Sequence, residues 1–345
     1  MKKKFIKFLL VILIIVLGFI AFASYYIFSA GKPFKPNSKE NISIEVMQGA
    51  TIRSISDELE KQGVIKSAFA FRIYCKIHGH DRDFKAGSYI FSPSMDAEKI
   101  ATELKTGEVN NISFTIPEGY TVKQIAEKLS KEGIADYNKF MDVAANGDFD
   151  FSFLKDAVKG EDRLEGFLFP DTYLLSANSS EKEIIAKMLS RFDEVYSKEY
   201  RKKAKAMGYS DKQIITIASI IERETVLDDE RAKVSSVIYN RLKEEKKLEM
   251  CSTVQFVLGI HKQFLSYEDT SIESPYNTYI NKGLPPGPIA CPGEASIKAA
   301  LNPAKTDYLY FVVSSKGDGS MEFSKDYDEF LANKEKYYAS VEGKK

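Results

Sequence analysis

One carboxylate in this chain of 345 residues, Glu222, stands in a sequence context that favours acid–base chemistry. It follows residues 214–221, which are almost entirely apolar, and Ser210 with Gln213 has the S-x-x-Q spacing of a capping box. Apolar residues recurring at intervals of three and four predict a helix over residues 211–224. On that helix Glu222 shares a face with small and apolar side chains, and such burial favours the protonated carboxyl. A protonated Glu is the donor that a glycosidic oxygen needs.

The same residues permit two other interpretations. Glu222, Arg223 and Glu224 are also typical of a solvated last helical turn, since charged residues are rarely buried without a partner. A hydrolase would need a second carboxylate roughly 5 to 9.5 Å away across the sugar. Glu224, Glu165 and Asp171 are the candidates for it, and the last two are also predicted to contact substrate. Glu224 lies about 200° around the helix from Glu222, which predicts a supporting role in the fold.

Downstream of the helix, a Tyr-Asn-Thr-Tyr segment at residues 276–279 precedes a loop rich in proline and glycine at residues 283–293. Prolines fix the backbone and glycines permit tight turns, so a shaped loop surface is predicted. Aromatic, amide and hydroxyl groups on such a surface can bind sugars by stacking and hydrogen bonds. The predicted substrate contacts are Tyr276, Asn277, Thr278, Tyr279, Gln255 and Asn240.

The front half of the chain contains a repeat. Residues 43–52 align with residues 113–122, and both copies read as a strand, a glycine turn and an amphipathic helix. The pattern predicts an α+β fold, with a small module at 42–108 and a larger catalytic domain at 109–336. The larger domain would contain a second copy of the module from about 113 to 192. The modules resemble LysM-type glycan-binding modules, and a packing or spacer role is the alternative.

The N-terminus predicts a single transmembrane helix. Four lysines in the first seven residues precede a run from Phe8 to Ala30 that carries no charge and is long enough to cross a bilayer. The lysines predict a cytoplasmic N-terminus and an extracytoplasmic catalytic domain, in a single-pass protein of the cell membrane. A cleaved signal peptide is the alternative. Residues 31–41 are expected to form a linker, and residues 337–345 a polar tail.

Composition gives no support to nucleic-acid binding, to a disulfide framework or to a metal site. Lys+Arg and Asp+Glu both total 49, so net charge gives no argument for nucleic acid. Cys75, Cys251 and Cys291 imply no complete disulfide framework. Histidines are scarce and have no convincing metal-ligand spacing, so neither a metal nor another cofactor is expected.

Several motifs in order along the chain resemble the YceG-like family of endolytic murein transglycosylases. They are LEGFLFPDTY, ASIIERET, VIYNRL, STVQ, YNTY, GLPPGPIACPGEASIKAALNPA and DYLYFV. The resemblance implies a membrane-anchored enzyme that cuts nascent peptidoglycan between N-acetylmuramic acid and N-acetylglucosamine. It leaves 1,6-anhydromuramic ends and acts beside peptidoglycan synthases. The family's catalytic glutamate falls on Glu222, whereas Cys251 stands where many relatives carry an aspartate.

The reaction implied for Glu222 uses the same carboxyl in two steps, first as an acid and then as a base. The carboxyl first protonates the leaving oxygen and then, as a carboxylate, takes the proton from the C6 hydroxyl that closes the anhydro ring. The substrate's N-acetyl group is expected to stabilise the oxocarbenium-like centre. A scaffold that binds glycan without cleaving it, and so positions wall synthases, is the alternative of a different class.

Overall fold

The computed structural model describes residues 17–18, 31–38, 40–80, 82, 84–107, 111–155, 157–176 and 179–342. The chain divides into two compact units. The first unit comprises residues up to 113 together with 174–178, and the second comprises 114–173 and 179–345.

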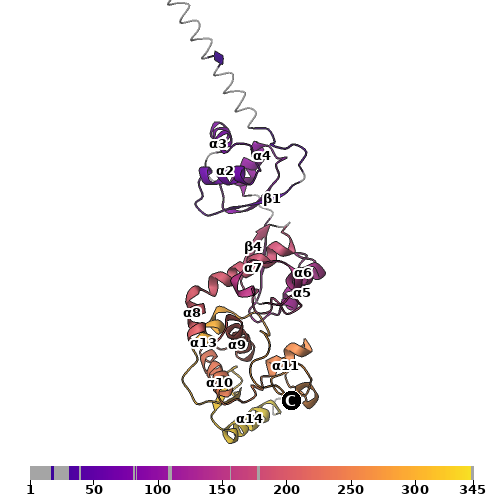
Figure 1. Cartoon of the computed structure of the whole chain (residues 1–345), viewed down its shortest axis with the longest axis vertical. Coiled ribbons are helices and arrows are strands. Elements are labelled where there is room, and N and C mark those ends of the chain that lie inside the picture. Colours follow the sequence, from indigo (N-terminus) through magenta and orange to yellow (C-terminus); the bar gives the residue numbers. More distant parts are fainter. Residues whose placement is uncertain are drawn as a thin grey trace, which may run out of the picture. The chain divides into compact units, whose positions relative to one another are not determined.

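The first unit is a two-stranded antiparallel sheet with three helices around one apolar core (Figure 1). Its elements are β1 (Ile42–Val46), α2 (Ile52–Lys61), α3 (Ala68–Ile77), β2 (Gly87–Phe91) and α4 (Ala97–Thr106). Ile44 pairs with Tyr89 across the sheet, and both side chains are buried with Leu59. Alternate residues of β1 face the core, as the period of a half-buried strand requires.

The second copy of the repeat forms the same local elements. They are β3 (Asn111–Thr115), α5 (Val122–Lys131), α6 (Tyr137–Asn146), the short 3-10 helix η1 (Ser152–Leu154), β4 (Thr172–Ser176) and α7 (Glu181–Val195). Strands β3 and β4 form a two-stranded sheet. Thr121 caps α5 through a capping box, as Thr51 caps α2 in the first copy. The shared Thr cap therefore explains why both segments turn from strand to helix at the same place.

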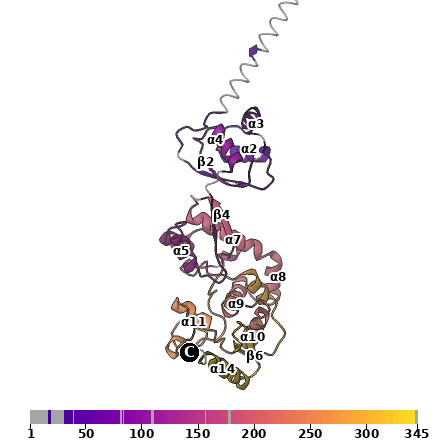
Figure 2. The ribbon, with the colours of Figure 1, turned by 180° about the vertical axis from the view of Figure 1, so that it is seen from behind.

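Helix α9 (Asp211–Glu224) is central to the remainder of the second unit (Figure 2). Its residues 214–221 are all buried, which the apolar run predicts. The helices that pack against it are α8 (Lys198–Ala206), α10 (Arg231–Lys243), α11 (Cys251–Leu258) and α13 (Glu294–Leu301), while the short α12 (Tyr267–Thr270) packs on α11. The predicted helix at 211–224 is thus present with the expected bounds and the Ser210 cap.

The chain ends in a β-hairpin and a helix. Strands β5 (Tyr310–Val313) and β6 (Met321–Ser324) pair antiparallel, and α14 (Tyr327–Glu342) packs on both. Residues 337–342, expected in a polar tail, belong to α14. Part of the expected linker is also ordered against the first unit, because Lys35 N–H donates to the carbonyl of Pro93 at 2.8 Å.

The prediction of a transmembrane helix is wrong for the part of the chain that the structure describes. No helix there is both long and apolar enough to cross a membrane. The longest, α14, has 16 residues and carries charges, whereas a spanning helix needs about 20 apolar residues. Apart from Leu17 and Gly18, the run from Phe8 to Ala30 lies outside the described residues. The α+β class is confirmed, but the spanning helix and the single-pass membrane location are not supported.

A tight contact at Gly166 fixes the loop before β4 against α9. Gly166 has a φ of +84°, and a Cβ there would lie 2.5 Å from Cβ of Pro288 and 2.9 Å from Cγ2 of Ile215. Because proline is rigid and α9 is packed, Gly166→Ala is expected to lower the free energy of unfolding by about 2–4 kcal/mol. Urea unfolding measures this loss. Gly133→Ala is the matched control, since φ is +71° but nothing lies within 4 Å. Equal losses in the two variants would contradict the contact.

Candidate active site

Glu222 is held in a buried ionic cluster at the end of α9. Its side chain is only 7% exposed, and Oε1 lies 3.3 Å from Nη1 of Arg231 on α10. The N–H of Gly293 donates to Oε2 at 2.9 Å. Arg231 also donates to Ser296 on α13 at 2.7 Å and to Asp228 at 3.0 Å. The sequence predicts apolar surroundings for Glu222. In the structure, the carboxylate itself contacts a cation and a backbone N–H.

A second carboxyl, Glu118, lies beside this cluster. A Cβ on Gly293 would lie 1.8 Å from Oε1 of Glu118, so the absence of a side chain at 293 makes room for this carboxyl. Burial raises the pKa of Glu118, and the charge of Glu222 raises it further, while Arg231 opposes the shift. Sequence reasoning missed Glu118. The repeat contained a signal for it, because Glu118 in the second copy aligns with the uncharged Gln48 in the first.

Glu224, two residues beyond Glu222, lies in different surroundings. It is half-buried, and the N–H of Ser252 at the start of α11 donates to its Oε1 at 3.1 Å. Burial raises the pKa of Glu224, and the bonds from Ser252 and the nearby Arg223 oppose the shift. No Arg or Lys forms an ion pair with it among the described residues. A raised pKa favours the protonated carboxyl, which is the form that donates a proton.

Glu224 lines a cavity of about 710 Å³ in the second unit. One side of this cavity is formed by α11 and the loop that carries Tyr279, and the other by the β5–β6 hairpin and α14. Aromatic rings are frequent in its wall: Phe264, Tyr279, Tyr310, Phe311, Tyr327, Phe330, Tyr337 and Tyr338. A concave, aromatic-lined surface with a few polar groups is typical of a binding site, and aromatic faces suit the stacking of sugar rings. Glu222 and Glu118 do not line this cavity.

Two of the predicted substrate contacts, Tyr279 and Gln255, line the cavity with Glu224. The Tyr279 hydroxyl lies 3.0 Å from Sγ of Cys251, the residue that departs from the family's aspartate. The side-chain amide of Gln255 donates to the carbonyl of Lys262 at 2.9 Å. These residues place hydroxyl, thiol and amide groups in the wall of the cavity that Glu224 lines.

The other members of the Tyr-Asn-Thr-Tyr segment support the loop instead. Asn277 is completely buried and donates through Nδ2 to the carbonyls of Thr270 at 3.0 Å and Ile272 at 2.8 Å. Thr278 is buried and accepts from the N–H of Met250 at 3.0 Å. The Tyr276 hydroxyl donates to Asp162 at 3.2 Å. None of these three lines the cavity, although they fix the loop that presents Tyr279.

The remaining predicted site residues lie in separate contacts. Asn240 on α10 donates through Nδ2 to the carbonyls of Thr306 and Tyr308, both at 2.9 Å. Glu165 is buried and accepts from the N–H of Val122 at 3.1 Å, and burial raises its pKa to about 8. Asp171 pairs with Arg191 at 2.7 Å. The structure thus does not bring these three to the cavity.

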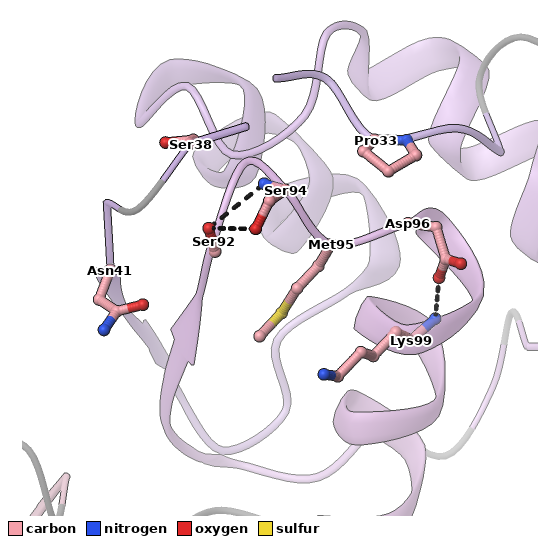
Figure 3. A pocket seen from close by; sticks show the side chains of 8 residues that line it. All are labelled: Pro33, Ser38, Asn41, Ser92, Ser94, Met95, Asp96 and Lys99. Atoms are coloured by element: carbon pink, nitrogen blue, oxygen red, sulfur yellow. Dashed lines mark hydrogen bonds between the residues drawn. The ribbon is translucent and has the colours of Figure 1, made fainter. Parts of the chain in front are cut away.

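A smaller cavity of about 400 Å³ lies in the first unit (Figure 3). Its polar lining groups are largely engaged with one another. The hydroxyls of Ser92 and Ser94 lie 2.8 Å apart, and Asp96 accepts from the N–H of Lys99 at 2.8 Å as the cap of α4. Asp96 is the carboxylate in the wall of this cavity, and it is engaged as that cap. Across the described residues, no group of three or more His, Cys, Asp or Glu is arranged to hold a metal ion.

Comparisons with known proteins agree along most of the chain. Residues 44–336 match the model of the YceG-like family. A Bacillus subtilis protein named endolytic murein transglycosylase is 37% identical over 322 residues, which are 90% of this chain and 88% of that protein. A Streptococcus pneumoniae protein of the same name is 30% identical over 84% of this chain and 57% of its own length. A crystal structure of a yceG-like protein from Listeria monocytogenes is 35% identical, with a TM-score of 0.58, and covers 86% of this chain and 99% of that one.

Proposed function

The chain belongs to the YceG-like family, and from this premise we infer that it is an endolytic peptidoglycan lytic transglycosylase. Relatives named endolytic murein transglycosylase match it over most of its length, so the reaction and the substrate class follow from them. The enzyme cleaves the β-1,4 bond between N-acetylmuramic acid and N-acetylglucosamine inside the strand. An aromatic-lined cavity with a half-buried carboxyl is the observation in this structure that supports the assignment.

We propose Glu224, rather than the Glu222 indicated by the sequence, as the catalytic acid. Three observations support this choice. Glu224 lines the cavity and Glu222 does not. Burial raises the pKa of Glu224, which favours the form that donates a proton. Glu222 already accepts from Arg231 and from Gly293, and both are donors that a carboxylate prefers.

The proposed reaction uses Glu224 in two steps. The protonated carboxyl donates its proton to the O4 oxygen that leaves with N-acetylglucosamine, and the C1–O4 bond breaks. The C6 hydroxyl of the muramyl sugar then forms the C1–O6 bond, and the Glu224 carboxylate accepts its proton. The acid is restored and water is not consumed. The N-acetyl group of the muramyl sugar is placed to stabilise the positive charge at C1, as in substrate-assisted glycosidases.

Tyr279 and Gln255 are the proposed substrate contacts, because they line the same cavity as Glu224. Tyr276, Asn277, Thr278 and Asn240 are proposed to act indirectly, by fixing the loops around that cavity. Peptidoglycan synthases make the strands that this enzyme cuts, so they are proposed as its partners.

Cleavage in water enriched in heavy oxygen tests the reaction type. Ring closure takes its oxygen from the sugar itself, so the new muramyl ends are expected to contain no heavy oxygen and to lack the mass of a water. A hydrolase would place one solvent oxygen at every new end. Mass spectrometry of the products from uncrosslinked glycan separates the two results. A muramidase of known hydrolytic mechanism, run in parallel, provides the positive control for incorporation.

A further inference from the structure

The C-terminal helix contributes a regularly spaced set of side chains to the cavity. Tyr327, Phe330, Lys334, Tyr337 and Tyr338 all line it, at intervals that place them on one face of α14. Four of the five are aromatic. Lys334 is the cation in this set, and it is half-buried.

The ammonium of Lys334 contacts rings instead of an anion. Nζ lies 5.8 Å from the ring centre of Phe330 and 5.7 Å from that of Tyr338. Within the described ranges, no carboxylate forms a salt bridge with it. Other cations in the cavity wall have acceptors, since Arg241 binds Glu249 at 2.9 Å and Lys262 binds Asp269 at 2.6 Å. Lys334 is therefore a cation held in place by aromatic faces, with its charge left for a ligand.

Lys334 and Glu224 line the same cavity. Cys251, at the start of α11, lines the cavity with both of them. A glycan bound with its scissile bond at Glu224 would occupy the cavity that α14 also lines. The sugar rings of a peptidoglycan strand are neutral, and the negative charges lie on the lactyl group of the muramyl sugar or on the stem peptide attached to it.

We propose that Lys334 binds a carboxylate of the muramyl substituent, and so makes the enzyme prefer muramyl-containing glycan to neutral chitin-like glycan. The proposal rests on the function proposed above. A partly desolvated ammonium facing a carboxylate favours charged partners and disfavours neutral ones. Two sources of the carboxylate share this chemistry, the stem peptide and, once the peptide has been removed, the free lactyl group.

The test compares Lys334→Met with wild type on three glycans. These are uncrosslinked strands with stem peptides, strands stripped of peptides by an amidase, and neutral N-acetylglucosamine oligomers. Lys334→Met is expected to raise KM about fivefold to tenfold for one or both charged glycans, with kcat little changed. Binding of the neutral oligomer, measured by calorimetry, should not change. Lys334→Arg should restore most of the preference, and the effect should weaken in high salt.

Lys336→Met is the matched control, because Lys336 is exposed on the same helix and lies outside the cavity wall. The charged glycan whose KM responds identifies the source of the carboxylate. An unchanged KM for both charged glycans would overturn the proposal, and so would an equal loss of affinity for the neutral oligomer. If wild type cleaves no glycan, the proposed function fails, but calorimetry of charged and neutral glycans on the same variants still decides the role of Lys334.

Discussion

Replacing Glu224 with Gln is expected to lower the rate of glycan cleavage by at least about 10³-fold, because one side chain supplies the acid and then the base. Gln keeps the shape and the acceptor for the Ser252 N–H, but it has no proton to give to O4. Release of anhydromuramic ends from uncrosslinked glycan, followed by mass spectrometry, measures the loss. Binding of glycan to the variant should persist, since the cavity wall is unchanged.

Glu222→Gln is the control that separates the two carboxyls of α9. It removes the charge that pairs with Arg231 and leaves the cavity intact. We expect lower stability and, in the folded fraction, anhydro product at a rate close to that of wild type. Full activity in Glu224→Gln together with its loss in a folded Glu222→Gln protein would assign the acid to Glu222, as the sequence indicated.

Replacing Arg231 with Met is expected to lower the free energy of unfolding by about 3–5 kcal/mol. The side chains of Arg231 and Glu222 are 8% and 7% exposed, so the substitution leaves a buried carboxylate without its cation, next to a second carboxyl at Glu118. Chemical denaturation followed by circular dichroism measures the change. The high cost arises from the charge left behind and is larger than the net contribution of the intact pair.

Two further variants test this explanation of the Arg231 effect. Asp228→Asn should cost little, because that carboxyl is 83% exposed although it also contacts Arg231. A double variant with Arg231→Met and Glu222→Gln should be more stable than Arg231→Met alone, because no unpaired charge at 222 remains. If the double variant is as unstable as the sum of the single ones, the loss comes from packing and not from charge.

The sequence predicted the helix that carries both candidate acids but not the groups that contact their side chains. The capping box at Ser210 and the apolar run give α9 and its burial directly, because both are local. The choice between Glu222 and Glu224 depends on what surrounds the end of the helix. The Arg231 guanidinium and the Gly293 N–H come from segments 9 and 71 residues away along the chain. No pattern within α9 could indicate that these two groups would form hydrogen bonds to the Glu222 carboxylate.

The Tyr-Asn-Thr-Tyr segment shows a similar limit. Its residue types suit sugar binding, and Tyr279 does line the cavity. Asn277 and Thr278 also carry hydrogen-bonding groups that suit a sugar, but these groups already bond to backbone groups of the protein. The sequence does not indicate the wall formed by α14, because residues 337–345 are typical of a polar tail. The spacing of Tyr337 and Tyr338 from Tyr327 and Phe330 nevertheless continues one helical face.

The two walls of the cavity are attached to the fold in different ways. Glu224 and its surroundings sit on α9, which is packed against four other helices. The opposite wall is α14, which packs on the β5–β6 hairpin and is the last element of the chain. Substitutions on the cavity-facing side of α14 would therefore change this wall while leaving the packing of α9 around Glu224 unchanged.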